Sequence, residues 1–199
     1  MGDVSILILA AGQSSRMRGA DKLLQEIDGV AVLRRQVLAA LGTGAAVYVA
    51  LAPDRPARGT VLQDLEFGRV EVAQARDGMG ASIRAGVSGL ADNCTGVAIV
   101  PADMPELTTQ DLRLVLDKFR AAPDQVCRAT SEAGVAGHPV VFPARLFAAL
   151  ARLSGDNGAR AVLQGETPRL TALPGDHAVT DLDTPEDWAA WHAARKPRR

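Results

Sequence analysis

Apolar runs of strand length alternate with segments of helical periodicity along roughly the first 120 residues of the chain. The first run, residues 4–10, is continuous and rich in branched side chains, as expected for a strand that is covered on both faces. Similar patterns predict further strands at residues 45–51, 69–75 and 96–103. Between the strands, apolar side chains recur at the spacing of a helix in residues 30–41, 80–91 and 108–122.

The rest of the chain predicts shorter elements. Two short strands are expected at residues 125–130 and 138–142, on either side of a glycine-containing turn. Helices are expected at residues 143–153, 157–164 and 185–195. Trp188 and Trp191 lie three residues apart on the last of these helices and therefore share a face, which favours packing in the core over a ligand-binding role.

Strands that alternate with helices are typical of βαβ units around a mostly parallel sheet, so the sequence predicts an α/β protein. At 199 residues, with no repeat and no linker-like segment, residues 1–199 are expected to form a single domain. The basic stretch at residues 195–199 is interpreted as a frayed, solvated end.

Composition and charge exclude several classes of protein. The net charge of −1 gives no reason to expect binding to nucleic acid or to an acidic membrane surface. No apolar run approaches the ~20 residues that span a bilayer, and no secretory signal pattern follows the first residues. Cys94 and Cys127 have neither CxxC spacing nor a neighbouring histidine cluster, which favours a reducing, cytoplasmic setting without zinc or disulfides.

The loop after the first strand carries two cations among small residues. Gly12 permits a tight turn, and the backbone N–H groups of Ala11, Gly12 and the serines that follow can bind an anion or a base edge. Arg16 can bind phosphate oxygens with two parallel hydrogen bonds, and Lys22 adds a point charge. The glycine spacing fits neither the Walker A motif nor GxGxxG. A phosphate site is favoured over a plain surface turn, because ligands of open α/β sheets bind beyond the carboxyl ends of the strands.

Carboxylates follow the strand at 96–103 and precede the last helix. Asp103 stands between two prolines and can hold a Mg²⁺ ion that also touches phosphate, although an Asp turn or helix cap explains it about as well. Asp181 and Asp183 are two residues apart and face one side if they lie on a strand. One of them can instead serve only as a cap for the helix that begins near Pro185.

Three further polar residues have more than one interpretation. His138 precedes a proline, a position where a histidine is more often structural than catalytic. Asp156 lies in a glycine-flanked turn, and Arg160 follows it on a short helix. Both fit either turn chemistry or a contact with a substrate.

Taken in order, these motifs resemble a known family. The segment LAAGQSSRMRGADKLL resembles the signature loop of nucleotidyltransferases, and it is followed by GMGASIRAGV, PADMPELT, GHPVVF, GDNGARAVL and DLDTPEDW. Together these segments, which extend from about residue 4 to residue 188, resemble the molybdenum cofactor cytidylyltransferases among the MobA-like NTP transferases. The first loop is shared across many nucleotidyltransferases, whereas the later motifs narrow the branch.

The resemblance implies a three-layer, Rossmann-like nucleotidyltransferase fold and a Mg²⁺-dependent reaction. A phosphate of the acceptor, molybdopterin or molybdenum cofactor, would attack the α-phosphorus of an NTP and release pyrophosphate. The implied partners are these small molecules and a recipient molybdoenzyme or its chaperone. The implied site residues fall into four groups: Leu9, Ala10, Ala11, Gly12 and Ser82 for the nucleoside; Arg16 and Lys22 for the triphosphate; Asp103 with Asp181 or Asp183 for the metal; and His138, Asp156 and Arg160 toward the acceptor.

Two positions bear on specificity. Relatives that use guanine tend to have Gly-Gly where this chain has Ala11-Gly12, which favours a pyrimidine nucleotide such as CTP. Many members have glycine where this chain has Arg18, so that side chain either adds to the phosphate site or faces solvent. Three alternatives stay open: transfer to a sugar or alcohol phosphate, an oxidoreductase that uses the loop for NAD(P)H, and a non-catalytic binding protein such as a chaperone for the cofactor. Against the second alternative stand the missing GxGxxG motif and the presence of Asp103.

Overall fold

A central sheet of seven strands, in the order β5-β4-β1-β6-β8-β7-β9, organises the chain. The computed structural model describes residues 3–155 and 158–195. The strands of the sheet are β1 (Asp3–Ala10), β4 (Val47–Leu51), β5 (Gly68–Glu71), β6 (Cys94–Pro101), β7 (Cys127–Thr130), β8 (Ala136–Pro143) and β9 (Arg169–Ala172). β8 runs antiparallel to its neighbours β6 and β7, and the other pairings are parallel. The prediction of a mostly parallel sheet is therefore confirmed.

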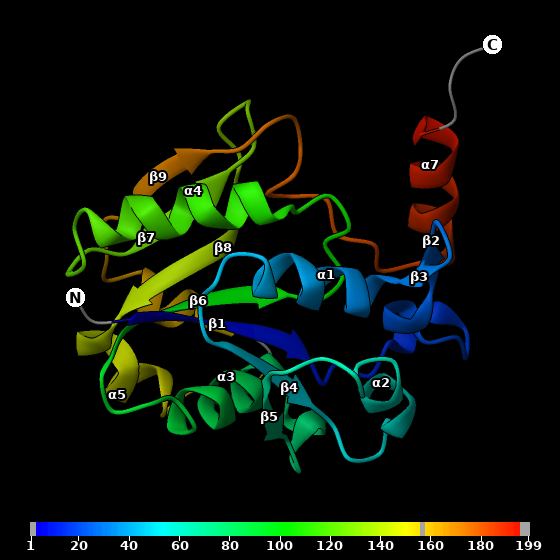
Figure 1. Ribbon diagram of the computed structural model, residues 1–199, viewed down its shortest axis with the longest axis horizontal. Helices are drawn as coiled ribbons and strands as arrows, with labels where there is room; N and C mark the ends of the chain where they lie inside the picture. The colour runs from blue at the N-terminus through cyan, green and yellow to red at the C-terminus, as the bar shows by residue number, and fades with distance from the viewer. Residues whose placement is uncertain (1–2, 156–157, 196–199) are drawn as a thin grey trace.

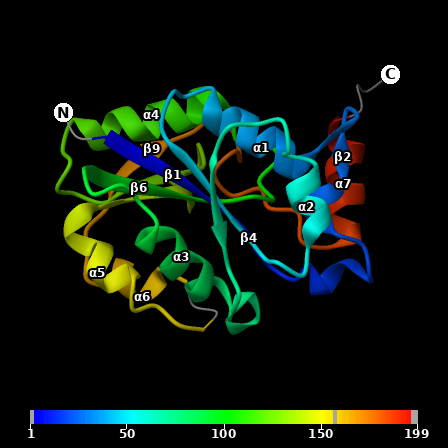
Figure 2. The same cartoon turned by 60° about the horizontal axis from the view of Figure 1, so that its bottom comes forward.

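Helices cover both faces of the sheet and give the molecule three layers (Figure 1). One face is covered by α1 (Val32–Leu41) and α4 (Thr109–Arg120), and the other by α3 (Met79–Ser88), α5 (Phe147–Leu150) and α6 (Arg160–Leu163), as the rotated view in Figure 2 also shows. Side chains of β1 alternate between the two layers: Ile6 and Ile8 join the core under α1 and α4, whereas Leu7 joins the core under α3. Strand β1 is thus buried on both faces, as its continuous apolar run predicts.

Close packing of α3 on β1 explains Gly86 of that helix. A Cβ atom built on Gly86 would lie 2.3 Å from Leu7 Cδ2, which is far inside van der Waals contact. Glycine at this position therefore lets the helix approach the sheet closely. The sequence pattern alone had indicated only a helix that its glycines weaken.

The last helix, α7 (Pro185–Arg195), lies beyond the carboxyl end of β1, next to the small hairpin of β2 (Glu26–Ile27) and β3 (Val30–Ala31) (Figure 1). Trp188 is buried in the larger core and meets Trp191 edge to face, so the shared-face prediction for the two rings is confirmed. Trp191 Nε1 donates to Glu106 at 2.8 Å, which ties α7 to the loop after β6.

Several element boundaries differ from the prediction. The strand expected at residues 69–75 ends at Glu71, because residues 75–77 form a 3-10 turn. The helix expected at residues 143–153 is a 3-10 turn followed by the short α5. Three elements were not foreseen: the β2–β3 hairpin, β9, and α2 (Pro56–Thr60), a short helix with a proline at its start.

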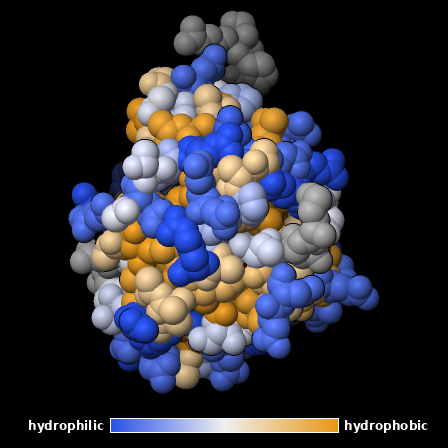
Figure 3. All heavy atoms as spheres, turned by 90° about the vertical axis from the view of Figure 1, so that its left-hand side faces the viewer, coloured by the Kyte–Doolittle hydropathy of each residue, from blue (hydrophilic) through white to orange (hydrophobic). Residues whose placement is uncertain are grey.

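The direction of the strands separates two opposite ends of the molecule. In Figure 1 the parallel strands point away from the labelled N-terminus, so that their carboxyl ends gather on the side of α2 and α7. Figure 3 shows the opposite end, where polar and apolar side chains are interspersed. After β1 the chain adds β4 and β5 on one side of that strand, and it then crosses over to add β6 on the other side. Ligands of open α/β sheets bind at such a switch in strand order. In the part of the chain that the structure covers, every helix is too short or too polar to cross a membrane.

Candidate active site

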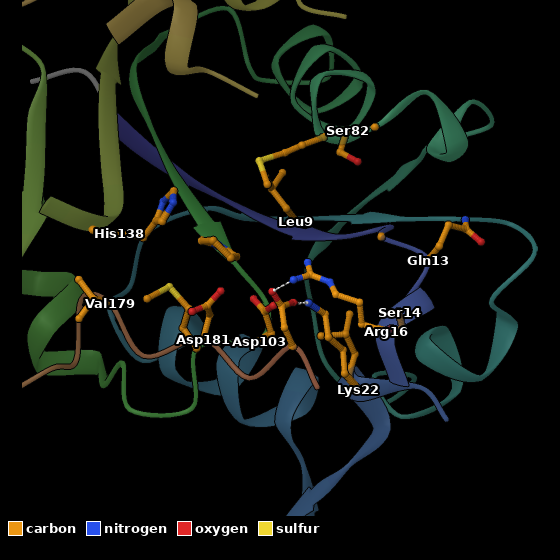
Figure 4. Close-up of a pocket in the computed structure, with 18 of the residues that line it drawn as sticks. Leu9, Gln13, Ser14, Arg16, Lys22, Ser82, Asp103, His138, Val179 and Asp181 are labelled. Carbon is orange, nitrogen blue, oxygen red and sulfur yellow. Dashed lines mark hydrogen bonds and ion pairs between the residues drawn. The ribbon is translucent and has the colours of Figure 1, made fainter. Parts of the chain in front are cut away.

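A cavity of about 820 Å³ opens at the carboxyl ends of β1 and β6. Its walls come from the loop after β1, the start of α3, the loop after β6, strand β8 and the segment before α7. Figure 4 shows Arg16 and Lys22 pointing toward acidic side chains from one side of this cavity, whereas His138 lies at the other end. The carboxyl ends of the strands, where the sequence predicts a ligand site, therefore border a cavity with charged groups at one end.

Lys22 joins the two acidic segments of the site. Its ammonium group bonds to the Asp103 carboxylate and also donates to Asp183 Oδ1 at 2.6 Å. Arg16 Nη1 lies 2.6 Å from the other oxygen of Asp183. Burial alone would lower the pKa of Lys22, but the carboxylates of Asp103 and Asp183 outweigh it and raise that pKa, so the ammonium stays charged.

Backbone hydrogen bonds fix the two acidic segments against each other. The N–H of Ala102 donates to the carbonyl of Leu9, which holds the end of β6 beside the end of β1. The N–H of Leu182 donates to the carbonyl of Asp103 at 3.2 Å, so Asp181 and Asp183 flank a residue that is tied directly to the loop after β6. Residues far apart in the sequence are thereby brought to one end of the cavity.

Thr184 caps α7, and this leaves Asp183 available to the site. The Thr184 hydroxyl accepts from the N–H of Asp187 at 3.1 Å, and Asp187 in turn accepts from the N–H of Thr184 at 2.8 Å. This reciprocal pair is the capping arrangement typical of a helix start. The alternative that Asp183 serves only as a helix cap is therefore wrong, because its carboxylate binds Lys22 and Arg16 instead.

Three carboxylates form a group that fits a divalent cation. Ligand oxygens of Asp103, Asp181 and Asp183 all lie within 4.8 Å of one another. Partial burial, together with the nearby charges of Asp103 and Asp183, raises the pKa of Asp181. Asp181 has no ion pair within the described chain, so the local negative charge is only partly balanced. An all-oxygen set with excess negative charge is the chemistry that Mg²⁺ and Mn²⁺ prefer.

The signature loop presents its glycine to the cavity. No atom lies within 4 Å of the position that a Cβ atom on Gly12 would occupy, and Gly12 lines the cavity. Packing within the protein therefore does not require glycine here, and the open space is available to a ligand. Arg18 points away from this space, because its guanidinium pairs with Glu186 on α7 and its side chain is 73% exposed. Of the two alternatives for Arg18, the structure favours a surface contact over the phosphate site.

The residues expected to contact the nucleoside divide into two groups. Leu9, Gly12 and Ser82 line the cavity, with Ser82 placed there by the first turns of α3. Ala10 and Ala11 are not among the lining residues, because their methyl groups are buried in the cores on opposite sides of the sheet. A contact between either alanine and a nucleotide stays a prediction.

A second cavity of about 350 Å³ adjoins the end of the first that holds His138. Met79, Arg128 and His138 line both cavities, and Arg160 lines only the second. Burial and the charge of Arg128 lower the pKa of His138, which keeps its ring neutral near pH 7. His138 Nδ1 is buried and has no hydrogen-bond partner among the described residues. Asp156 lies outside the residues that the structure describes.

Two arginines of the site were missed from the sequence. Arg58, on the unforeseen α2, is fully buried and bonds to the loop after β1. Arg128, on β7, donates to the carbonyl of Gly137 at 3.1 Å and stands between the two cavities. Both residues sit in segments that look like an ordinary polar loop and an ordinary strand, and only the tertiary fold brings them to the site.

Comparison with known proteins gives the family. A model of the MobA-like NTP transferase domain matches residues 6–177, which include the signature loop, Asp103 and His138. The chain belongs to the MobA-like NTP transferase family. This family consists of nucleotidyltransferases, so the chain is a nucleotidyltransferase with the loop, cations and carboxylates of its site arranged around one cavity. No curated protein sequence matches the chain.

Solved structures agree with this family in fold. Rv0371c from Mycobacterium tuberculosis is 26% identical, with a TM-score of 0.85 over 95% of this chain and 96% of that one. A second structure of Rv0371c, in complex with manganese, is 24% identical with a TM-score of 0.80 over 94% and 97% of the two chains. A nucleotidyl transferase from Methanothermobacter is 19% identical with a TM-score of 0.78 over 96% and 97%. The predicted Rossmann-like nucleotidyltransferase fold is confirmed.

Proposed function

We propose that this nucleotidyltransferase transfers CMP from CTP to the phosphate of a molybdopterin-type acceptor and releases pyrophosphate. The observation that carries the proposal is the group formed by Lys22, Asp103 and Asp183 beside the open face of Gly12. A cationic loop and a carboxylate cluster at one end of a cavity are what transfer of a nucleotidyl group needs, because positioning and charge neutralisation supply most of the rate.

The triphosphate occupies the end of the cavity that holds the cations. Arg16, whose side chain is 67% exposed, can turn from Asp183 to phosphate oxygens without leaving a buried charge unpaired. Lys22 is held more rigidly by its two carboxylates and stays charged, so it is suited to stabilise the pyrophosphate that leaves. The acceptor phosphate is already ionised at neutral pH, so the reaction requires no general base from the chain.

Asp103, Asp183 and Asp181 would hold the divalent cation. A bound Mg²⁺ would supply neutralisation of charge on the phosphate oxygens, in addition to the charges of Arg16 and Lys22. The chain itself supplies the carboxylate geometry, which the bond between Leu182 and the Asp103 carbonyl fixes before any ligand arrives. The manganese in the Rv0371c structure supports a divalent cation in a relative of the same fold.

The acceptor enters from the opposite end, where the two cavities meet. Arg128 provides an anion-binding group at this junction, and the neutral His138 ring provides an unoccupied hydrogen-bond acceptor at Nδ1. The second cavity is lined mainly by apolar side chains of α3, α6 and the sheet, with Arg160 at its edge. Such a cavity suits an acceptor with a ring system better than a polyol phosphate, whose hydroxyl groups would lose their water there.

The choice of CTP rests on Ala11. Its methyl group fills the core under α3, so the backbone beside Gly12 is more constrained than with two successive glycines. Relatives that use guanine tend to have two successive glycines here, so the Ala11-Gly12 pair favours a pyrimidine over a purine. The product would pass to a recipient molybdoenzyme or its chaperone in the cytoplasm.

A panel of ATP, CTP, GTP and UTP with Mg²⁺ and molybdopterin, read by pyrophosphate release, tests this function. We expect release with CTP well above the other three nucleotides, and release reduced by roughly 100-fold or more in the Asp103→Asn variant. Release that depends on a sugar phosphate but not on molybdopterin would assign a different acceptor. A preference for GTP would overturn the role given to Ala11.

A further inference from the structure

Arg58 lies at the centre of a hydrogen-bond network under the signature loop. Its side chain is fully buried, although it stands on a short helix in a polar segment. Nη1 donates to the carbonyls of Ala10 and Gly12, both at 2.7 Å, and Nη2 donates to Ser14 Oγ at 3.0 Å. Nε and Nη2 also donate to the two oxygens of Asp21 at 2.8 and 2.9 Å. The guanidinium makes five hydrogen bonds, which equals its number of N–H donors.

The two bonds to carbonyls fix the direction of the peptide planes in the loop. In a trans peptide the C=O of one residue and the N–H of the next point in opposite directions. Because Arg58 draws the Gly12 carbonyl toward α2, the N–H of Gln13 must point away from α2. Arg55 Nη2 donates to the carbonyl of Gln13 at 2.9 Å, which orients the N–H of Ser14 in the same way.

These oriented N–H groups are free for a ligand. Residues 12–16 all line the large cavity, and their backbone N–H groups donate to no other group within residues 3–155 and 158–195. Successive unpaired N–H groups in a concave loop form an anion-binding surface. Arg58 also acts on Lys22 indirectly, because it binds both carboxylate oxygens of Asp21, the residue before Lys22. Asp21 accepts from the N–H of Leu23 at 3.0 Å and so caps the 3-10 turn that carries Lys22.

Stability alone does not account for a buried arginine at this position. Burying a charged pair carries a desolvation cost that an apolar side chain of the same size avoids, so such pairs give little net stability. What a guanidinium provides, and an apolar side chain cannot, is five donors in a fixed plane. Its partners are two loop carbonyls, a loop hydroxyl and the carboxylate next to Lys22, all of which belong to the loop that faces the cavity.

We propose that Arg58 is a positioning residue that holds the loop from Ala10 to Lys22 in the shape that binds the triphosphate. The inference rests on the proposed function, because it takes an NTP to be the ligand of the loop. Arg58 is fully buried and is not among the residues that line the cavity, so it acts through the peptide planes and through Asp21. Its loss therefore weakens binding of the nucleotide more than it affects the carboxylate site.

The test compares Arg58→Ala, Arg58→Lys and Asp21→Asn with Arg34→Ala as the matched control. Arg34 also joins a backbone carbonyl and a carboxylate, those of Val61 and Asp64, but it does not touch the loop. For each protein we would measure CTP affinity and Mn²⁺ affinity by calorimetry, together with the thermal unfolding midpoint. We expect CTP affinity to fall at least tenfold in both Arg58 variants and severalfold in Asp21→Asn, with Mn²⁺ affinity and the Arg34→Ala control within twofold of wild type.

A rescue experiment separates positioning from general destabilisation. Free guanidinium ion at millimolar concentration should restore part of the CTP affinity of Arg58→Ala and leave wild type unchanged, because it refills the same network. If folded Arg58 variants bind CTP like wild type, the inference is wrong. If Arg58→Ala does not fold, Asp21→Asn decides, and CTP affinity equal to wild type in that variant overturns the inference. If wild type itself binds no CTP, the proposed function has failed instead.

Discussion

Lys22 donates a hydrogen bond to Asp183 at 2.6 Å, although 161 residues separate the two in the sequence. The bond joins the loop that follows the first strand to the segment that precedes the last helix. The site is thus complete only when the C-terminal part of the chain has docked beside the N-terminal loop.

Replacing Asp103 by Asn should abolish most pyrophosphate release while the chain stays folded. The change removes one ligand charge of the carboxylate cluster and one partner of Lys22 without altering the size of the side chain. Loss of metal-assisted charge stabilisation corresponds to a decrease of roughly 100-fold or more. Pyrophosphate release and Mn²⁺ affinity would be measured together. Full activity with normal metal affinity would remove Asp103 from the metal site.

Replacing Arg16 by Ala should weaken CTP binding by roughly 10- to 100-fold, because a charge-assisted, two-pronged contact contributes on the order of 1.5–3 kcal/mol. Arg18→Ala is the matched control: it removes the same charge from the same loop, but its guanidinium pairs with Glu186 instead of facing the cavity. Calorimetric titration with CTP distinguishes the two. Equal effects of both changes would show that the loop acts only through its total charge.

Replacing Gly12 by Ala should change stability and binding in opposite directions. The backbone of Gly12 does not have a positive φ and the space for a methyl group is open, so the substitution should stabilise the fold by about 0.5 kcal/mol. The same methyl group would enter the cavity, and CTP affinity should fall about tenfold. Urea unfolding and CTP titration give the two values. Unchanged affinity would mean that the nucleotide does not approach this residue.

His138 should make stability depend on pH below its ordinary pKa of 6.5. Burial and the charge of Arg128 lower the pKa of His138 in the folded state. At pH values between this lowered pKa and 6.5, His138 therefore binds a proton more readily in the unfolded chain than in the folded one. The wild type should therefore lose stability as the pH falls below 6.5, and His138→Gln should lose less over the same range. Urea unfolding of both proteins from pH 7.5 to 5 tests this. Parallel pH profiles would contradict a buried, neutral ring.

The sequence pattern predicts those parts of the fold whose residues are buried by regular elements. The apolar runs of β1, β4 and β6 and the amphipathic α4 were found because burial on one or two faces leaves a period in the sequence. The β2–β3 hairpin, α2 and β9 were missed, since elements of two to five residues are too short to show a period. The burial of Trp188 could be predicted because two large aromatic rings on one face of a helix usually pack in the core.

The candidate site divides in the same way. Asp103, Arg16 and Lys22 lie in loops that follow buried strands, and ligands of open α/β sheets bind at the carboxyl ends of the strands. The structure brings these three side chains together at one end of the cavity. Arg58 and Arg128 carry no such signal. The partners of Arg58 are mainly backbone carbonyls and a carboxylate 37 residues earlier. Every residue has a backbone carbonyl, so the sequence does not indicate which carbonyls an arginine will bind.

The five bonds of Arg58 also bear on how this loop can be transplanted. A designer who copied only residues 10–22 onto another α/β sheet would copy the glycine and the cations but leave out the group that sets the peptide planes. The smallest transferable unit is two separate segments, the loop and residues 55–60, which carry Arg55 and Arg58. By the same logic, recombination between related genes with a crossover between residues 22 and 55 should keep the loop functional only when the parent that supplies the downstream segment carries these arginines.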